Sequence, residues 1–312
     1  MARYESILGL IGDTPLVGLH ALSPNPRVRI WAKLEGQNPG GSSKDRIALK
    51  MVELAERDGA LTPGATILEP SSGNTGIGLA LVARLRGYHL RVVMPDNVSV
   101  ERRQLLEIFG AEVTSSPGEE GSNGAIRLAE KIAADQPEYV LLFQYGNPAN
   151  PLAHYEGTGP EIWRDCPEVD VFVAGLGTSG TLMGVGRFLK EHKAGVKIIA
   201  VEPPAGELVQ GLRNLDDGFV PPIFDGAILD RKFIVRPRES IEFTRRLLDE
   251  CGVFAGISSG AAVAGAVKMA AQMDEGTIVT LLPDGGWKYL SSGAWTDDLD
   301  VVEERAQRIN YW

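Results

Sequence analysis

The chain of 312 residues has few cysteines, few histidines and no long apolar segment. Its two cysteines, Cys166 and Cys251, lie far apart and in no Cys-x-x-Cys spacing, which predicts reduced thiols rather than a disulfide framework. None of the four histidines stands in a recognisable nucleophile motif. No apolar run approaches the roughly 18 residues that a membrane helix needs, and the first residues carry no secretory pattern. We therefore expect a cytoplasmic protein without a membrane partner.

Basic residues are also fewer than acidic residues. The chain has 31 Lys and Arg against 41 Asp and Glu, a formal net charge of −10. A negative chain repels polyanions, so we expect no nucleic-acid partner. Hydrophobic residues make up 44% and charged residues 23% of the chain, which excludes disordered, collagen-like and coiled-coil proteins. The length is sufficient for two ordinary domains.

Strand-like and helix-like segments alternate along most of the chain. Apolar residues at helical spacing predict helices, and short alternating or apolar runs predict strands. Such repeated units form parallel sheets with helices on both faces, so the predicted fold class is α/β, with two doubly wound, mainly parallel sheet domains and a cleft between them. A Pro-rich stretch at 146–151 divides the series. We predict a smaller domain of residues 36–146 with 1–12 and a larger one of 147–312, joined by strands from 13–35. The predicted helices are 44–57, 75–86, 99–109, 122–134, 182–192, 240–251 and 261–273, and the predicted strands are 28–34, 66–68, 90–94, 112–114, 139–143, 171–174, 196–201 and 277–282.

Three glycine-rich turns interrupt this pattern, and the first, 38–46, places Lys44 on the first turn of a predicted helix. The helix dipole disfavours a cation there and lowers its pKa. An amine with a lowered pKa suits Schiff-base chemistry. On this turn alone, an ordinary solvent-exposed lysine is the simpler interpretation.

The second turn, 69–76, offers backbone N–H groups and hydroxyls at a helix N-terminus. This arrangement suits a carboxylate or a phosphate. The alternative is simple N-capping, which stabilises a helix by about 1 kcal/mol and needs only one side chain. Four hydroxyl or amide side chains within five positions favour a ligand.

The third turn, 174–181, formally fits the dinucleotide fingerprint Gly-x-Gly-x-x-Gly, with Glu202 after the next predicted strand as a ribose acceptor. A nicotinamide-dependent dehydrogenase is therefore one interpretation. The other is a nest for a single phosphate, because Thr178, Ser179 and Thr181 add hydroxyl donors. A dehydrogenase accounts for this turn alone, whereas a pyridoxal phosphate enzyme accounts for all three.

The motifs at 41–46, 71–76, 144–148, 177–181 and 256–261 resemble, in order and spacing, those of the cysteine synthase family. This family belongs to the fold type II pyridoxal phosphate enzymes, and the resemblance extends from about residue 7 to about residue 295. It implies pyridoxal 5'-phosphate in the cleft between the domains, an amino-acid substrate, a homodimer and no metal.

The resemblance also implies roles for individual residues. Lys44 would bind the cofactor covalently and move the α-proton of the substrate. Asn74 would contact the cofactor's ring oxygen and Ser258 its pyridine nitrogen. Ser43 precedes the lysine where relatives often have a larger apolar residue, a change that we expect to be tolerated. The substrate, with its carboxylate, would be held by Ser71, Ser72, Gly73, Thr75 and Gln144, and the cofactor phosphate by Gly177, Thr178, Ser179, Gly180 and Thr181.

The segments 211–221 and 284–291 resemble the members that use O-phospho-L-serine, in which an arginine binds the substrate phosphate; here that arginine is Arg213. The alternative for Arg213 is an ion pair with Asp216 or Asp217. The sulfur donor would be sulfide or a thiocarboxylated sulfur-carrier protein, with the end of the chain, 309–312, either guarding the site or docking on the dimer partner.

The predicted activity is thus the synthesis of L-cysteine from an O-activated L-serine by β-replacement. O-acetyl-L-serine sulfhydrylation and, more distantly, cystathionine β-synthesis are the alternatives within the resemblance. Outside it, an NAD-dependent dehydrogenase and a non-catalytic binding protein remain; retained Lys44 argues against the latter.

Overall fold

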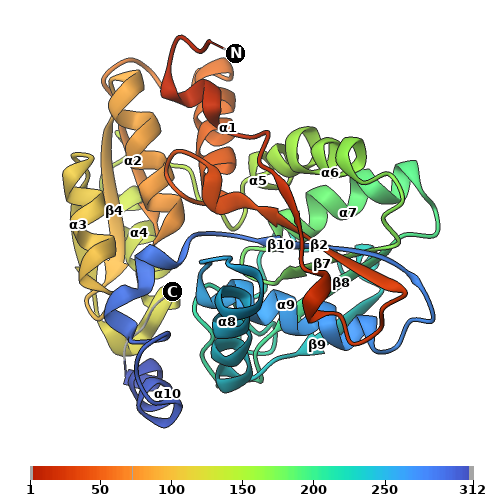
Figure 1. The fold of residues 1–312 in the computed structure, drawn as a ribbon. Coiled ribbons are helices and arrows are strands. Elements are labelled where there is room, and N and C mark those ends of the chain that lie inside the picture. Colours follow the sequence, from red (N-terminus) through yellow and green to blue (C-terminus); the bar gives the residue numbers. More distant parts are fainter. Residues whose placement is uncertain (1–2, 72, 309–312) are drawn as a thin grey trace.

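The computed structural model describes residues 3–71 and 73–308, which form two β-sheets (Figure 1). The four-stranded sheet has the order β5-β4-β3-β6 and is parallel throughout. The six-stranded sheet has the order β1-β2-β10-β7-β8-β9, in which β1 alone pairs antiparallel among the described strands. The strands are Leu16–Gly18 (β1), Val28–Leu34 (β2), Thr66–Pro70 (β3), His89–Pro95 (β4), Glu112–Ser116 (β5), Tyr139–Leu141 (β6), Val171–Gly175 (β7), Lys197–Glu202 (β8), Arg231–Ile234 (β9) and Gly276–Leu282 (β10).

Helices cover both faces of each sheet. In Figure 1 the helices α1 to α4 surround the four-stranded sheet on the left, and α5 to α9 surround the six-stranded sheet on the right. No helix within residues 3–71 and 73–308 is both long and apolar enough to cross a membrane. The helices are Lys44–Arg57 (α1), Asn74–Arg86 (α2), Val100–Ile108 (α3), Gly121–Asp135 (α4), Ala149–Ala153 (α5), Gly159–Asp165 (α6), Gly180–His192 (α7), Pro237–Cys251 (α8), Ile257–Ala270 (α9) and Leu299–Arg308 (α10).

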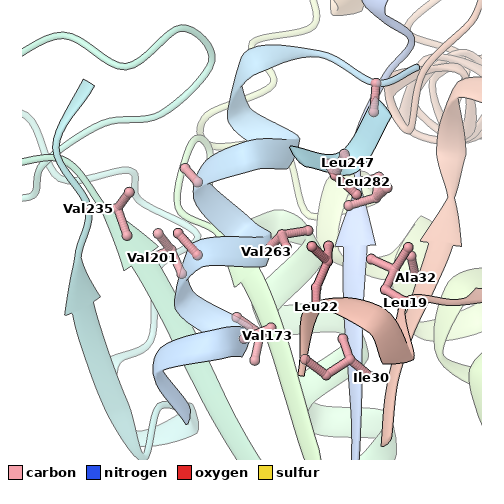
Figure 2. Packing of buried hydrophobic residues seen from close by; sticks show 14 of the residues in the cluster. Leu19, Leu22, Ile30, Ala32, Val173, Val201, Val235, Leu247, Val263 and Leu282 are labelled. Carbon is pink, nitrogen blue, oxygen red and sulfur yellow. The ribbon is translucent and has the colours of Figure 1, made fainter. Parts of the chain in front are cut away.

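Strand β7 carries apolar side chains on both of its faces, and a helix packs against each face. Val171 and Val173 belong to one cluster with Val263 of α9, and Figure 2 shows Val173 and Val263 in that cluster. Phe172, between the two valines, belongs to a different cluster and packs with Leu182 of α7. A strand that is apolar on both sides is typical of a central parallel strand between two helical layers. This packing confirms the predicted fold class, two doubly wound and mainly parallel sheets.

The predicted elements are found with shifts of a few residues at their ends, and the strand predicted at 139–143 ends early, at Leu141. The cause is Glu69, whose buried carboxylate accepts hydrogen bonds from the backbone N–H groups of Phe143 (2.8 Å) and Gln144 (3.1 Å). Phe143 turns to a positive φ of 56° to make them. The backbone therefore leaves the sheet here and directs Gln144 toward the site.

Strand β2 lies beside β10 in parallel, with Ile30 opposite Ile278. Two segments almost 250 residues apart in the chain are thus adjacent strands of the six-stranded sheet. The domain boundaries at 36, 146 and 147 stay a prediction.

Candidate active site

A pocket lies between the two sheets, at the carboxyl ends of their strands, where α/β proteins bind ligands. The three glycine-rich turns meet there with the first turn of α9. Every predicted site residue that the structure describes lines it, whereas Ser72 and the predicted tail 309–312 lie outside the described residues. Those lining residues are Lys44, Ser71, Gly73, Asn74, Thr75, Gln144, Gly177, Thr178, Ser179, Gly180, Thr181, Arg213 and Ser258.

Lys44 is the first residue of α1, and its side chain is half-buried in the pocket wall, so the interpretation as an exposed lysine is wrong. Its Nζ lies 3.1 Å from Oγ of the buried Ser43, and among the described residues no carboxylate lies within 4.0 Å of it. Burial lowers the pKa of Lys44, although the charge of Asp284 opposes this shift. Burial, rather than the helix dipole alone, therefore favours the neutral, nucleophilic amine.

The loop between β7 and α7 presents free backbone donors. The N–H groups of Gly177, Thr178 and Ser179 donate to no protein acceptor among the described residues. Ser179 adopts a left-handed conformation, φ 71°, which turns the loop before the N-terminus of α7. At Gly177 a Cβ atom would lie 2.9 Å from the carbonyl oxygen of Gly211, so the loop tolerates no side chain there. Free N–H groups at a helix N-terminus fit a phosphate group.

Two neighbours hold the threonines of this loop. Asn150 Nδ2 donates to Thr178 Oγ1 at 2.9 Å, and His154 Nε2 lies 3.2 Å from Thr181 Oγ1. Burial lowers the pKa of His154 to about 3, so this imidazole is neutral at physiological pH. The loop is thereby positioned by uncharged partners and keeps its positive potential for a ligand.

The turn between β3 and α2 is organised around hydroxyl groups. Ser71 Oγ accepts the N–H of Gly76 at 3.0 Å, which makes Ser71 a capping residue as well as a lining residue. Thr75 Oγ1 donates to Gln144 Oε1 at 2.6 Å, and Gln144 Nε2 donates to the carbonyl of Pro70 at 3.3 Å. The N-cap position of α2 is Gly73, so Ser71 satisfies a helix-start N–H from two residues earlier, while Gly73, Thr75 and Gln144 stand in the pocket wall.

Arg213 is 6% exposed and forms no ion pair with Asp216 or Asp217, the alternative raised by the sequence. Its guanidinium carbon lies 4.7 Å from the ring centre of Phe219 and 5.4 Å from that of Tyr145. Asp217 instead accepts the backbone N–H of Gly206. The described residues place no carboxylate within 4.0 Å of Arg213, so its charge is available to an anion.

The guanidinium of Arg213 also reaches α4, a helix that packs on the four-stranded sheet. It donates to Ser122 Oγ at 3.0 Å and to Asn123 Oδ1 at 3.2 Å, both in the first turn of α4. Its known partners are therefore neutral groups, which an anionic ligand can replace.

Sequence reasoning missed several lining residues, among them Arg102, Tyr145, Leu212 and Tyr289. Arg102 is 3% exposed and lies 5.2 Å from the ring centre of Tyr289. Tyr145 and Leu212 adjoin residues that were predicted, so proximity in the chain could have found them. Arg102 belongs to a charged helix face that carries no motif, and only the packing of α3 on the 286–292 segment brings it to the pocket.

Glu202, the ribose acceptor of the dehydrogenase interpretation, is buried at the end of β8 and pairs with Lys232 Nζ at 2.7 Å. It does not line the pocket. By contrast, the free N–H groups of the 177–179 loop and the Lys44 amine share one pocket. The site therefore fits a single phosphate and a reactive carbonyl better than a dinucleotide.

Comparisons with known proteins agree with this geometry. The family model described as "Pyridoxal-phosphate dependent enzyme" matches residues 7–284. Cysteine synthase B of Escherichia coli (strain K12) is 41% identical over 289 residues, 92% of this chain and 95% of that protein. Cysteine synthase of Staphylococcus aureus (strain N315) is 43% identical over 304 residues, 94% of this chain and 98% of that protein.

Solved structures show the same similarity. Cysteine synthase from Entamoeba histolytica superposes with a TM-score of 0.89 at 37% identity, covering 98% of this chain and 96% of that chain. O-ureido-L-serine synthase superposes with a TM-score of 0.89 at 40% identity, covering 94% of this chain and 96% of that chain.

Proposed function

Since the chain belongs to the cysteine synthase family of pyridoxal-phosphate dependent enzymes, we propose that it makes L-cysteine by β-replacement on an O-activated L-serine, with O-phospho-L-serine preferred. In the net reaction the Cβ–O bond of O-phospho-L-serine breaks and phosphate leaves, while a Cβ–S bond forms to the sulfur donor. The observation that carries the proposal is one pocket that combines the half-buried Lys44 amine, the free N–H groups of residues 177–179 and Arg213.

When bound, pyridoxal phosphate supplies an electron sink that makes the α-proton of an amino acid acidic. Gly177, Thr178 and Ser179 would hold its phosphate through their backbone N–H groups. Ser258, a pocket residue that is 4% exposed, would face its pyridine nitrogen with a neutral hydroxyl. A hydroxyl cannot stabilise a protonated ring nitrogen as a carboxylate does, which favours elimination over transamination.

The remaining groups act on the substrate. Gly73, Thr75 and Gln144 would bind its carboxylate and fix the Cα–H bond toward Lys44. The Lys44 amine, whose pKa burial lowers, can take the proton from Cα as a base and return it in the second half of the reaction. Arg213 would bind the phosphate at Cβ and stabilise it as it leaves.

The activity is tested on the purified chain supplied with pyridoxal phosphate. We expect a visible absorbance band that borohydride removes, and L-cysteine when O-phospho-L-serine and sulfide are added. A chain that gains no such band and makes no cysteine would contradict the proposed function.

The phosphoserine preference is tested separately with Arg213→Ala. Loss of a charge-assisted contact of about 1.5–3 kcal/mol predicts a decrease of roughly 10- to 100-fold in kcat/KM for O-phospho-L-serine relative to O-acetyl-L-serine. Arg236→Ala, which removes an exposed arginine paired with Glu207, is the matched control. If the ratio of the two kcat/KM values is unchanged in Arg213→Ala, the preference is wrong and O-acetyl-L-serine sulfhydrylation stands.

Sulfide and a thiocarboxylated carrier protein are both proposed as sulfur donors, and the resemblance implies a homodimer. The donors are compared by the rate at which each restores the cofactor's spectrum after O-phospho-L-serine has been added. The assembly is measured by sedimentation of the cofactor-loaded chain.

A further inference from the structure

Asn74, the first residue of α2, is held at both ends of its side-chain amide. Its Nδ2 donates to Asp284 Oδ2 at 2.7 Å, and its Oδ1 accepts from Lys288 Nζ at 2.7 Å. Asp284 follows β10 and Lys288 lies in the segment Gly286–Ser292, so both come from the far end of the chain. Both are almost fully buried, with exposed fractions of 2% and 1%. We refer to Lys288, Asn74 and Asp284 as the amide clamp.

The ammonium of Lys288 has no freedom left in this arrangement. Its other hydrogen bonds go to the carbonyl oxygens of Gly40 (2.9 Å) and Gly41 (3.1 Å), so all three of its N–H donors are used. Asp284 Oδ2 accepts a second hydrogen bond, at 2.6 Å, from the hydroxyl of Tyr289. Each end of the amide clamp is thus fixed by groups outside it.

The charges of the amide clamp determine which way the amide faces. An ammonium can only donate and a carboxylate can only accept. If the Asn74 amide were rotated by 180°, its NH2 group would face the ammonium of Lys288, and its oxygen would face the carboxylate of Asp284. Donor would then face donor, and acceptor would face acceptor. The amide is therefore locked, and its second Nδ2–H is the donor that Asn74 retains for a ligand in the pocket that it lines together with Lys44.

Burying the ammonium of Lys288 beside Asn74, at the start of α2, costs desolvation energy. Its direct partners are neutral oxygens, and the described residues place no carboxylate within 4.0 Å of its Nζ. Burial lowers the pKa of Lys288 to about 8, which reflects this cost. An apolar side chain of the same length would avoid the desolvation of an ammonium. The lysine offsets part of this cost by donating to the carbonyl oxygens of Gly40 and Gly41, and its third N–H orients the Asn74 amide.

We propose that Lys288 and Asp284 are positioning residues, which act through Asn74 by directing an N–H donor to an oxygen of the cofactor ring beside the Lys44 attachment point. The proposal rests on the proposed function, because the acceptor belongs to pyridoxal phosphate. It assigns the two residues no contact with substrate or cofactor of their own.

The test is a double-mutant cycle on cofactor affinity, measured by titrating the cofactor-free chain with pyridoxal phosphate. Lys288→Met should raise the cofactor Kd about tenfold, the loss expected for one misdirected hydrogen bond, and shift the visible band of the bound cofactor. In an Asn74→Ala background the same substitution should change Kd less than about twofold, because no amide remains to orient. Lys268→Met, a half-buried lysine of α9 paired with Glu239, is the control and should change neither value.

Unfolding of the cofactor-free chain in urea separates orientation from folding. Lys288→Met leaves the carbonyl oxygens of Gly40 and Gly41 without a donor, so it should lower the midpoint both with and without the Asn74 amide. The rise in cofactor Kd, by contrast, should appear only where the Asn74 amide is present, and a merely structural lysine would show no such difference. If Lys288→Met is recovered unfolded, Asp284→Asn, which removes the charge at the opposite end of the amide, replaces it in the same cycle.

Three results decide between the proposals. An equal rise in Kd with and without the Asn74 amide, or no rise at all, would overturn the amide clamp while leaving the proposed function intact. A wild-type chain that binds no pyridoxal phosphate would overturn both. A rise in Kd that disappears in the Asn74→Ala background supports the amide clamp.

Discussion

Lys44 and Arg46 stand two residues apart at the start of α1, and both side chains leave bulk water, but their surroundings differ completely. Arg46 bonds to Glu35 at 2.7 and 2.8 Å and to Glu161 at 2.6 and 2.7 Å. Its guanidinium joins segments from three parts of the chain. The side-chain amine of Lys44 has only the hydroxyl of Ser43 as a hydrogen-bond partner among the described residues.

The two pKa values follow from this difference. Burial opposes the charged form of both side chains. The charge of Glu35 and the hydrogen bonds that Arg46 donates to Glu161 outweigh burial at Arg46 and raise its pKa, whereas at Lys44 burial prevails and lowers the pKa. The carboxylates around Arg46 hold it in its charged state, whereas Lys44, with one hydroxyl partner and a place in the pocket wall, is suited to act as a nucleophile and a base. At these two residues, the presence or absence of a carboxylate partner, rather than burial, distinguishes the structural cation from the chemically reactive amine.

The strongest test of the comparison is Lys44→Ala. We expect kcat to fall on the order of 10³-fold or more, because the base that moves the α-proton is lost, and the borohydride-sensitive band to disappear. The free energy of unfolding of the cofactor-free chain should not fall by more than about 1 kcal/mol, since the amine removed is half-buried and has no charged partner. A variant that kept the covalent band would show that another amine binds the cofactor.

The converse test is Arg46→Met, which removes the cation and leaves Glu35 and Glu161 buried. The free energy of unfolding in urea should fall by about 3–5 kcal/mol, the cost of breaking a buried ion pair from one side. Arg187→Met removes an exposed arginine that pairs with Glu191 in α7, and it should cost less than about 1 kcal/mol. Equal losses in the two variants would show that the Arg46 pairs do not stabilise the fold.

The smallest effect is a pH dependence of stability that comes from Glu161, which pairs with Arg46 (2.6 Å) and with Lys33 (2.7 Å). Burial works against it, but hydrogen bonding to Arg46 lowers the pKa of Glu161 to about 2, below the ordinary value of 4.5. Between these values the unfolded chain binds a proton that the folded chain does not, so stability falls as the pH drops from about 4.5 toward 2. Glu161 contributes at most about 1.4 kcal/mol per pH unit to this slope.

Urea midpoints at pH 6, 4 and 3 measure the pH dependence. Glu161→Gln should flatten the fall between pH 4 and pH 3. A wild-type chain whose midpoint stays constant over this range would contradict the pairing of Glu161 with Arg46 and Lys33.

The sequence predicted most elements because helix and strand periodicities are local. The helix at 44–57 has the bounds that its apolar spacing indicates, and the glycine-rich turns lie between strand and helix as their composition indicates. The end of β6 could not be predicted, because the carboxylate that turns Phe143 out of the sheet belongs to Glu69, 74 residues earlier. Short β1 and β9 depend on neighbouring strands and carry too few residues to show a period.

The sequence by itself determined which side chains can do chemistry: an amine at a helix start, a hydroxyl-rich turn and a glycine loop before α7. Only the tertiary structure decided the state of each group. It placed Glu161 beside Arg46 and left Lys44 without a carboxylate partner. Arg213 forms no ion pair with Asp216 or Asp217. Lys288 and Asp284 form hydrogen bonds to the Asn74 amide. The reason is that desolvation and pairing depend on atoms within a few ångströms, and for Lys288 those atoms come from residues as many as 248 positions away.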